Sequence, residues 1–202
     1  MQQFDRQKFK DVIHYVVGKT RPEELGRVKL HKILYFTDMI WFIAEGHGLT
    51  GVEYRKQPMG PVAAGLGVAL GELEDEGRVR LGKMKYFGYE KATYETLQPV
   101  PEDRFSEMER RLLDDVIEFV CRNNTARSIS DFSHTRVWDA TENGAVMPYF
   151  TALNMLPVEI EDAAINWARE EAAKIVTARS KNPAVQRRNY RDFREGLRSY
   201  RG

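Results

Sequence analysis

Residues 29–36 read KLHKILYF, and this stretch decides the fold. Apolar side chains recur in it at helical spacing, and toward residue 45 they cover most of the helix circumference. A helix that is apolar nearly all round is buried at the centre of a domain. The sequence therefore predicts a long central helix from about residue 22 or 23 to residue 45, ended by Gly46 and Gly48.

Apolar periodicity and capping residues predict five further helices around the central one. Pro61 suits the first turn of the second of them. Ser106 and Glu109 have the capping-box form S-x-x-E at the start of the third, and Ser128 or Ser130 is expected to cap the fourth. The predicted ranges are 5–17, 61–77, 106–123, 128–134 and 158–178.

Extended structure is expected in three short regions, of which one, residues 145–150, follows an Asn143-Gly144 turn. Residues 46–61 are rich in Gly and Pro and predict an ordered loop with a short extended piece at 52–54. Residues 78–97 alternate apolar and charged side chains, which predicts an antiparallel ribbon of two or three strands. The predicted fold class is mainly α with a small antiparallel β-sheet (α+β), a compact multi-helix domain with a β-ribbon and a basic C-terminal extension.

Charge is distributed unevenly along the chain. The 202 residues carry 31 basic and 30 acidic side chains, and this balance excludes a basic coat over the whole protein. Residues 181–202 nevertheless hold 7 basic against 2 acidic side chains, whereas residues 1–180 hold 24 against 28. We therefore predict a domain over 1–180 and a basic tail over 181–202.

The sequence predicts a cytoplasmic protein with no membrane partner. Its N-terminus is polar, and its apolar stretches are shorter than the ~20 residues that span a bilayer. Cys121 is the single cysteine, so an internal disulfide is excluded, and the thiol is expected to be a packing residue.

No motif in the sequence supports catalysis. The patterns H-E-x-x-H, G-x-x-x-x-G-K-[ST] and G-x-S-x-G are absent. Ser130, Asp131, Ser133 and His134 lie close together, but the expected role of these residues is capping and local hydrogen bonding. We expect a non-enzymatic protein with no catalytic residue, no cofactor and no metal site.

Four pieces of sequence together resemble the Panacea domain of the SocA-like antitoxin family, a phage-associated protein type. They are residues 29–36, the loop 49–51, the Gly60-Pro61-Val62 piece and residues 129–134 with the following Trp138 and Tyr149. The resemblance covers about residues 5–155. The motif residues, expected to be mostly scaffold, are Lys29, Leu30, Lys32, Leu34, Tyr35, Phe36, Gly60, Pro61, Val62, Ser133, His134 and Trp138.

The resemblance implies a protein antitoxin. Such a protein binds and neutralises a cognate protein toxin encoded next to it, and some relatives deliver the toxin to a protease. Exposed aromatic and arginine side chains dominate protein interfaces, so they are the candidate toxin-binding residues. These candidates are Tyr86, Phe87, Tyr89, Arg187, Tyr190, Arg191, Phe193, Arg194 and Tyr200.

A DNA-binding transcriptional regulator is the alternative hypothesis. Helices followed by a ribbon resemble a winged-helix arrangement, and Lys83, Lys85 and the basic tail could contact phosphates. No predicted helix, however, presents a basic face with base-reading side chains near its start. Nucleic acid is therefore the secondary partner and a protein toxin the primary one.

Overall fold

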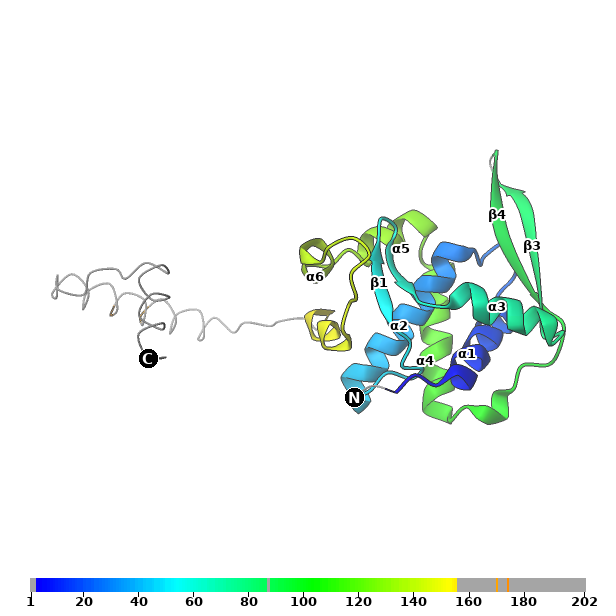
Figure 1. Ribbon diagram of the computed structural model, residues 1–202, viewed down its shortest axis with the longest axis horizontal. Coiled ribbons are helices and arrows are strands. Elements are labelled where there is room, and N and C mark those ends of the chain that lie inside the picture. Colours follow the sequence, from blue (N-terminus) through cyan, green and yellow to red (C-terminus); the bar gives the residue numbers. More distant parts are fainter. Residues whose placement is uncertain (1–2, 87, 156–169, 171–173, 175–202) are drawn as a thin grey trace, which may run out of the picture. The chain divides into compact units, whose positions relative to one another are not determined.

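The computed structural model describes residues 3–86 and 88–155, together with residues 170 and 174. The chain divides into two units, residues 1–156 and 157–202, and the fold below is that of the first unit (Figure 1). Its α-helices are α1 (Arg6–Lys19), α2 (Arg27–Glu45), α3 (Leu66–Asp75), α4 (Glu107–Ile117), α5 (Ala126–Phe132) and α6 (Arg136–Ala140). Its strands are β1 (Tyr54–Gln57), β2 (Gly60–Ala63), β3 (Val79–Tyr86) and β4 (Tyr89–Thr96). The predicted class, mainly α with a small antiparallel β component, is confirmed.

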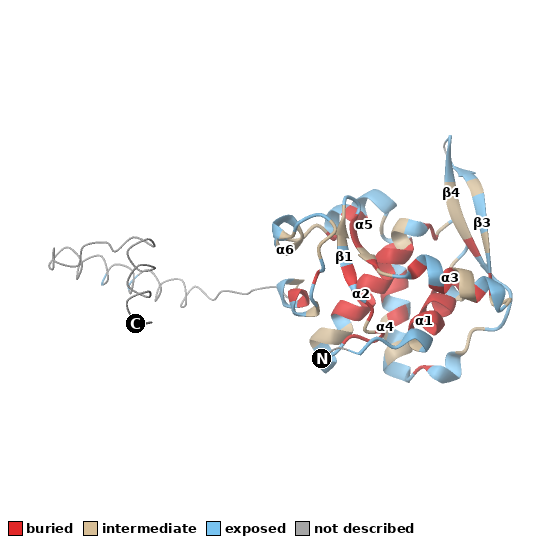
Figure 2. Cartoon of the chain, in the orientation of Figure 1, coloured by how far each residue is buried: buried red, intermediate tan, exposed pale blue. Residues whose placement is uncertain are grey.

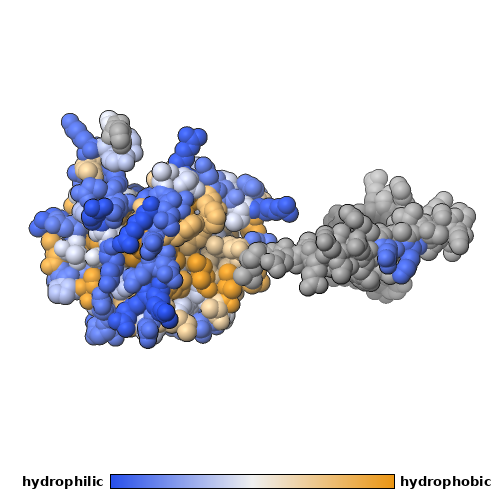
Figure 3. All heavy atoms as spheres, turned by 180° about the vertical axis from the view of Figure 1, so that it is seen from behind, coloured by the Kyte–Doolittle hydropathy of each residue, from blue (hydrophilic) through white to orange (hydrophobic). Residues whose placement is uncertain are grey.

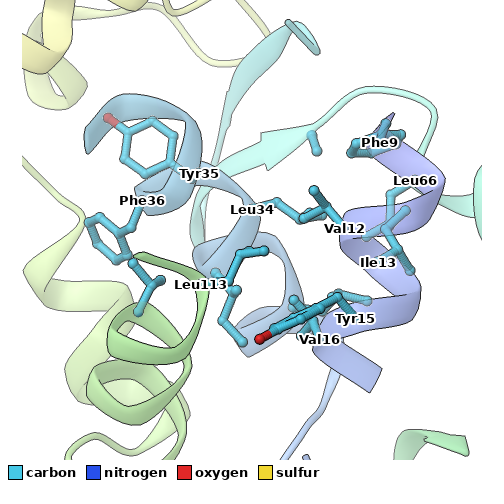
Figure 4. Packing of buried hydrophobic residues seen from close by; sticks show 14 of the residues in the cluster. Phe9, Val12, Ile13, Tyr15, Val16, Leu34, Tyr35, Phe36, Leu66 and Leu113 are labelled. Atoms are coloured by element: carbon cyan, nitrogen blue, oxygen red, sulfur yellow. The ribbon is translucent and has the colours of Figure 1, made fainter. Parts of the chain in front are cut away.

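Helix α2 is the centre of the unit, as predicted. Residues 30–39 are all buried, and Figure 2 shows buried residues along α2. Leu34 meets Val12 from α1, and Leu66 from α3 and Leu113 from α4 join the same core (Figure 4). Each such side chain contributes about 1.5–3 kcal/mol when it leaves water.

The start of α2 differs from its prediction. The helix begins at Arg27 rather than at residue 22 or 23. Arg21 and Glu24 close a turn through a backbone hydrogen bond of 2.9 Å and a side-chain ion pair. Gly26 then adopts an extended conformation, and Leu25 is fully buried. Local polar pairing therefore outweighs helix propensity over these residues.

The loop predicted over 46–61 is wrong in its second half. Strands β1 and β2 form an antiparallel hairpin in the register Tyr54↔Ala63 to Gln57↔Gly60. Pro61 lies in β2 and does not open a helix, because α3 begins only at Leu66. A two-stranded hairpin consists of edge strands, where proline is tolerated.

Strands β3 and β4 form the predicted ribbon, with two strands in the register Val79↔Thr96 to Tyr86↔Tyr89. The base of the ribbon is buried at Val79 and Tyr94, whereas its tip projects from the unit (Figures 1 and 2). The ribbon therefore presents its tip without burying it in the core.

The C-terminal half of the unit is built from capped helices. The Ser106–Glu109 capping box of α4 is confirmed, and this helix continues through a π-helical turn, η2 (Glu118–Arg122). The predicted cap of α5 is wrong: Thr125 is the N-cap, and Ser128 completes its capping box from the third helical position.

The last described segments also differ from the prediction. Trp138 lies in the short helix α6, which the sequence did not indicate. The predicted extended segment 145–150 contributes only a bridge at Val146 and then enters the 3-10 helix η3 (Tyr149–Met155). Two predictions, the helix over 158–178 and the boundary at residue 180, fall almost wholly outside the described residues and stay predictions.

Asp38 of α2 holds the hairpin against the central helix. Its carboxylate is fully buried and accepts hydrogen bonds from the Thr50 amide (2.7 Å), the Thr50 hydroxyl (2.6 Å) and the Tyr54 hydroxyl (2.7 Å). Burial raises the pKa of Asp38, and the hydrogen bonds from Thr50 and Tyr54 oppose that rise. The loop and the first residue of β1 are therefore fixed to the middle of α2.

A second buried carboxylate, that of Asp11 on α1, is paired with cations. Arg78 contacts one oxygen at 2.7 Å and Arg104 the other at 2.9 Å. Burial alone would raise the pKa of Asp11, but the hydrogen bonds from the two arginines outweigh burial and hold it below its usual range. These bonds join α1 to the start of the ribbon and to the segment before α4.

Some apolar side chains lie on the surface. Phe132, Phe150 and Leu153 are each more than half exposed, and Figure 3 shows an apolar area on the face opposite that of Figure 1. Among the helices of the described residues, none is long and apolar enough to cross a membrane.

Replacing Asp38 tests the role of its carboxylate. We expect Asp38→Ala to lower the free energy of unfolding by about 3 kcal/mol or more, because it leaves several buried donors without an acceptor. Asp75 is an exposed aspartate at the end of α3, and we expect Asp75→Ala to change stability by less than about 0.5 kcal/mol. Urea unfolding of the three proteins measures both values, and equal midpoints would contradict the assigned role.

Candidate functional site

Helix α2 points two lysines of the KLHKILYF stretch at backbone carbonyl groups. Lys29 and Lys32 are one helical turn apart and share a side of the helix. The Lys29 ammonium donates a hydrogen bond to the Cys121 carbonyl at 2.9 Å, and Lys32 donates to the Pro61 carbonyl at 3.2 Å. The neighbouring Leu30, Ile33 and Leu34 turn into the core with Tyr35 and Phe36.

Lys32, Gly60 and Ser133 meet at one point. Gly60 has a φ of +92°, and a Cβ there would lie under 3.0 Å from both the Lys32 ammonium and the Ser133 hydroxyl. Only glycine fits here, because it adopts a positive φ without strain and has no Cβ to clash with these groups. Ser133 donates to the Ser130 carbonyl at 2.6 Å, and Ser130 donates to the Met59 carbonyl at 2.9 Å. Helix α5 is thus fastened to the turn of the hairpin.

His134 and Trp138 form the adjoining part of the site. Their rings stack at a centroid distance of 3.6 Å and an interplanar angle of 8°, and the Lys56 ammonium lies 4.0 Å from the centre of the Trp138 ring. Burial, and then the positive charge of Lys32, hold the pKa of His134 below its usual value. His134 Nε2 and Trp138 Nε1 are buried without a hydrogen-bond partner among the described residues.

The structure therefore brings together motif pieces that lie far apart in the sequence. Lys32, Gly60, Pro61, Ser133 and His134 surround the hairpin turn, with Trp138 behind it. Most of their contacts are internal to the fold. The local hydrogen bonding predicted for His134 is seen at its backbone, where the amide donates to the Asp131 carbonyl at 3.1 Å, whereas the ring is held by stacking on Trp138.

A groove of about 910 Å³ opens beside this cluster, between the ribbon tip, the first turn of α2 and α5. We call it the ribbon groove. Tyr86 and Tyr89 line it and contact each other edge to face, with ring centroids 5.7 Å apart. Lys91 lies 5.1 Å from the centre of the Tyr86 ring and donates a hydrogen bond to the Glu23 carbonyl. Tyr89 is 58% exposed, so the groove offers an aromatic side chain to a partner.

The remaining predicted partner-binding residues are not placed. Phe87 and the six tail residues lie outside the described part of the chain. The tail residues are Arg187, Tyr190, Arg191, Phe193, Arg194 and Tyr200.

The ribbon offers less to nucleic acid than its sequence suggests. Lys83 is paired with Glu90 at 2.9 Å and Arg80 with Glu95 at 3.1 Å, so two of its cations face carboxylates. Lys85 is exposed. DNA binding stays an untested alternative that the ribbon supports weakly.

Sequence reasoning missed several residues that line the ribbon groove. Pro58 and Met59 reach it from the hairpin turn, and Arg27 and Arg127 from the first turns of α2 and α5. The Pro58-Met59-Gly60 stretch is typical of a turn, but the prediction of a loop over 46–61 did not place it between two strands.

Glycine substitutions separate close packing from backbone strain. We expect Gly60→Ala to lower the free energy of unfolding by more than about 2 kcal/mol, because it adds a clash with Lys32 and Ser133 to the cost of a positive φ. Gly144 has a φ of +81°, and an added Cβ there would have nothing within 4 Å, so Gly144→Ala measures the strain alone. Equal losses in chemical denaturation would refute the packing argument.

The buried amine of Lys32 predicts a pH-dependent stability. Burial lowers its pKa from 10.5 to about 7, so between these values the unfolded chain holds a proton that the folded chain has released. Folding therefore becomes more favourable as pH rises through this window, by at most about 1.4 kcal/mol per pH unit. Lys32→Met removes the amine and should remove this part of the slope. Parallel stability curves for the two proteins from pH 7 to pH 9, in phosphate-free buffer, would contradict the prediction.

Comparison with known proteins agrees with the resemblance seen in the sequence. The family model described as antitoxin SocA-like, Panacea domain, matches residues 30–139. Neither the curated proteins nor the solved structures include a match. The matched range contains α2 from Leu30 onward, both hairpins, α3, α4 and α5, and it includes the Lys32, Gly60 and Ser133 junction. The chain belongs to the SocA-like antitoxin family with a Panacea domain.

Proposed function

We propose that this protein is a non-enzymatic antitoxin that binds and neutralises a cognate protein toxin in the cytoplasm. The observation that carries the proposal is membership of the SocA-like antitoxin family over residues 30–139. The toxin is expected to be encoded next to this protein. Delivery of that toxin to a protease is a further step that the same family membership suggests.

The ribbon groove is the surface we assign to the toxin. Buried aromatic contacts provide much of the binding energy of protein interfaces, and Tyr86 and Tyr89 line a groove of about 910 Å³. The groove also carries both signs of charge, with Glu23 and Asp131 as well as Arg27 and Arg127. Such a mixture favours a partner of defined charge pattern over a uniformly charged polymer.

Growth rescue tests the antitoxin proposal. Each neighbouring gene is expressed alone in a heterologous bacterium and then together with this protein. We expect one neighbour to stop growth, and this protein to restore growth and co-purify with it. If no neighbour is toxic, the antitoxin proposal fails and salt-dependent binding to duplex DNA becomes the next assay. Rescue with loss of the toxin, reversed in a protease-deficient host, would indicate delivery to a protease.

A matched pair of variants tests the assignment of the groove. We expect Tyr89→Ala to weaken toxin binding at least tenfold, or about 1.4 kcal/mol, because it removes an exposed aromatic anchor. Met108→Ala is the control, since Met108 is 60% exposed on α4 and does not line the groove. Titration calorimetry with the purified toxin measures both. Unchanged affinity for Tyr89→Ala, with growth rescue intact, would place the toxin elsewhere.

A further inference from the structure

A second cavity, of about 530 Å³, lies between the first turns of α2, the β1–β2 hairpin and the start of α3. We call it the α2–α3 cavity. Its charged and titratable lining consists of Arg27, His31 and Lys32, and no acidic residue of the described chain lines it. A cavity with cationic side chains and no carboxylate is suited to an anion.

Two helix N-termini border this cavity. Gly26 is the N-cap of the 19-residue helix α2 and Gly65 that of the 10-residue helix α3, and neither helix has a side-chain cap. The first turn of each also lacks an acidic residue. The first amide N–H groups of a helix have no partner within the helix, and the helix dipole makes this end positive. First-turn residues of both helices line the same cavity, namely Arg27 and Val28 of α2 and Leu66 and Gly67 of α3.

His31 provides an independent observation. Its side chain is buried, with 7% of the residue exposed, and its Nδ1 accepts a hydrogen bond from the Ala63 amide at 3.1 Å. Nε2 therefore carries the hydrogen of the neutral ring. This N–H has no hydrogen-bond partner among the described residues, and the Nε2 atom is not fully enclosed by protein. Because His31 lines the cavity, its free N–H opens into it.

Lys32 adds a buried amine without a carboxylate. Only 1% of the residue is exposed, and among the described residues the hydrogen-bond acceptor of its ammonium is the single Pro61 carbonyl. No acidic side chain of that part of the chain counteracts the effect of burial on this amine. A buried ammonium normally has an anionic partner, so an anion brought from outside would complete its coordination.

We propose that the α2–α3 cavity binds the phosphate group of a small molecule of about mononucleotide size. A phosphate supplies several acceptor oxygens for Arg27, Lys32, the His31 N–H and the free backbone amides. Val62 and Leu66 line the same cavity and give the organic part of the ligand an apolar contact. The cavity shares Arg27 and the Pro58–Met59 turn with the ribbon groove, but His31 and Lys32 line the α2–α3 cavity and not the groove. Phosphate binding there does not depend on the identity of the toxin.

Binding is measured by titration calorimetry on the full chain, in phosphate-free buffer at constant ionic strength. The three probes are inorganic phosphate, adenosine 5′-monophosphate and adenosine. We expect the nucleotide to bind with a dissociation constant below about 1 mM, and adenosine to bind at least tenfold more weakly. Stronger binding of the nucleotide than of inorganic phosphate identifies a phosphate ester as the ligand, and equal binding identifies the free anion.

Two variants test the site without disturbing the core. Arg27 is exposed, and we expect Arg27→Gln to weaken nucleotide binding at least tenfold, whereas Arg111→Gln on α4, also exposed, should leave it unchanged. Gly67 has nothing within 4 Å of an added Cβ, so Gly67→Asp places a carboxylate in the first turn of α3. This acid should keep or raise the melting temperature through the helix dipole while abolishing binding.

Three outcomes would overturn the proposal. The first is the absence of heat with both phosphate and the nucleotide up to about 1 mM. The second is equal binding of adenosine and the nucleotide, since the phosphate would then contribute nothing. The third is full binding by folded Gly67→Asp protein. None of these results depends on toxin neutralisation, so the two proposals can fail separately.

Discussion

A buried carboxylate without a cation is the constraint on which the rest of this fold depends. Asp38 lies at the middle of α2, fully out of water, and each of its oxygens must find a donor inside the protein. Thr50 and Tyr54 supply those donors, and in doing so they draw the loop and the first strand of the hairpin onto the helix. The hairpin turn is then placed where Gly60 can pass close to Lys32. The Asp38 contacts thus place the site together with the Lys32–Pro61 and Ser130–Met59 hydrogen bonds.

Two buried ionisable groups of the central helix, Asp38 and Lys32, differ in how many hydrogen-bond partners they have. The Asp38 carboxylate is saturated with donors, whereas the Lys32 amine has a single carbonyl within the described part of the chain. Asp11 on α1 shows that this fold can pair a buried ion fully, since two arginines contact its two oxygens. An incompletely paired lysine in the same core is therefore costly for stability. A role in binding would explain why such a residue is kept beside a cavity.

The sequence predicted the helices that bury an apolar stripe and missed the elements that polar contacts create. The periodicity of residues 5–17 and 29–45 was sufficient for α1 and for most of α2, and the Ser106 capping box marked the start of α4. The β1–β2 hairpin was missed because Gly and Pro in 46–61 resemble a loop, and its pairing depends on distant Asp38. For the site, the sequence motif named the residues. That they come together at one point depends on tertiary packing, so it could not be predicted from their spacing.

The projecting ribbon separates residues that the fold needs from residues that are exposed to solvent. Its base is buried at Val79 and Tyr94, whereas Tyr89 at its tip is 58% exposed and lies outside the buried core. The backbone pairing of the two strands holds the tip together, and exposed charge pairs such as Lys83 with Glu90 add little to it. Replacement of a tip side chain therefore removes almost no folding energy. Mutations there can accumulate while the core sequence stays constant, so the exposed surface of the ribbon can change while the fold is retained.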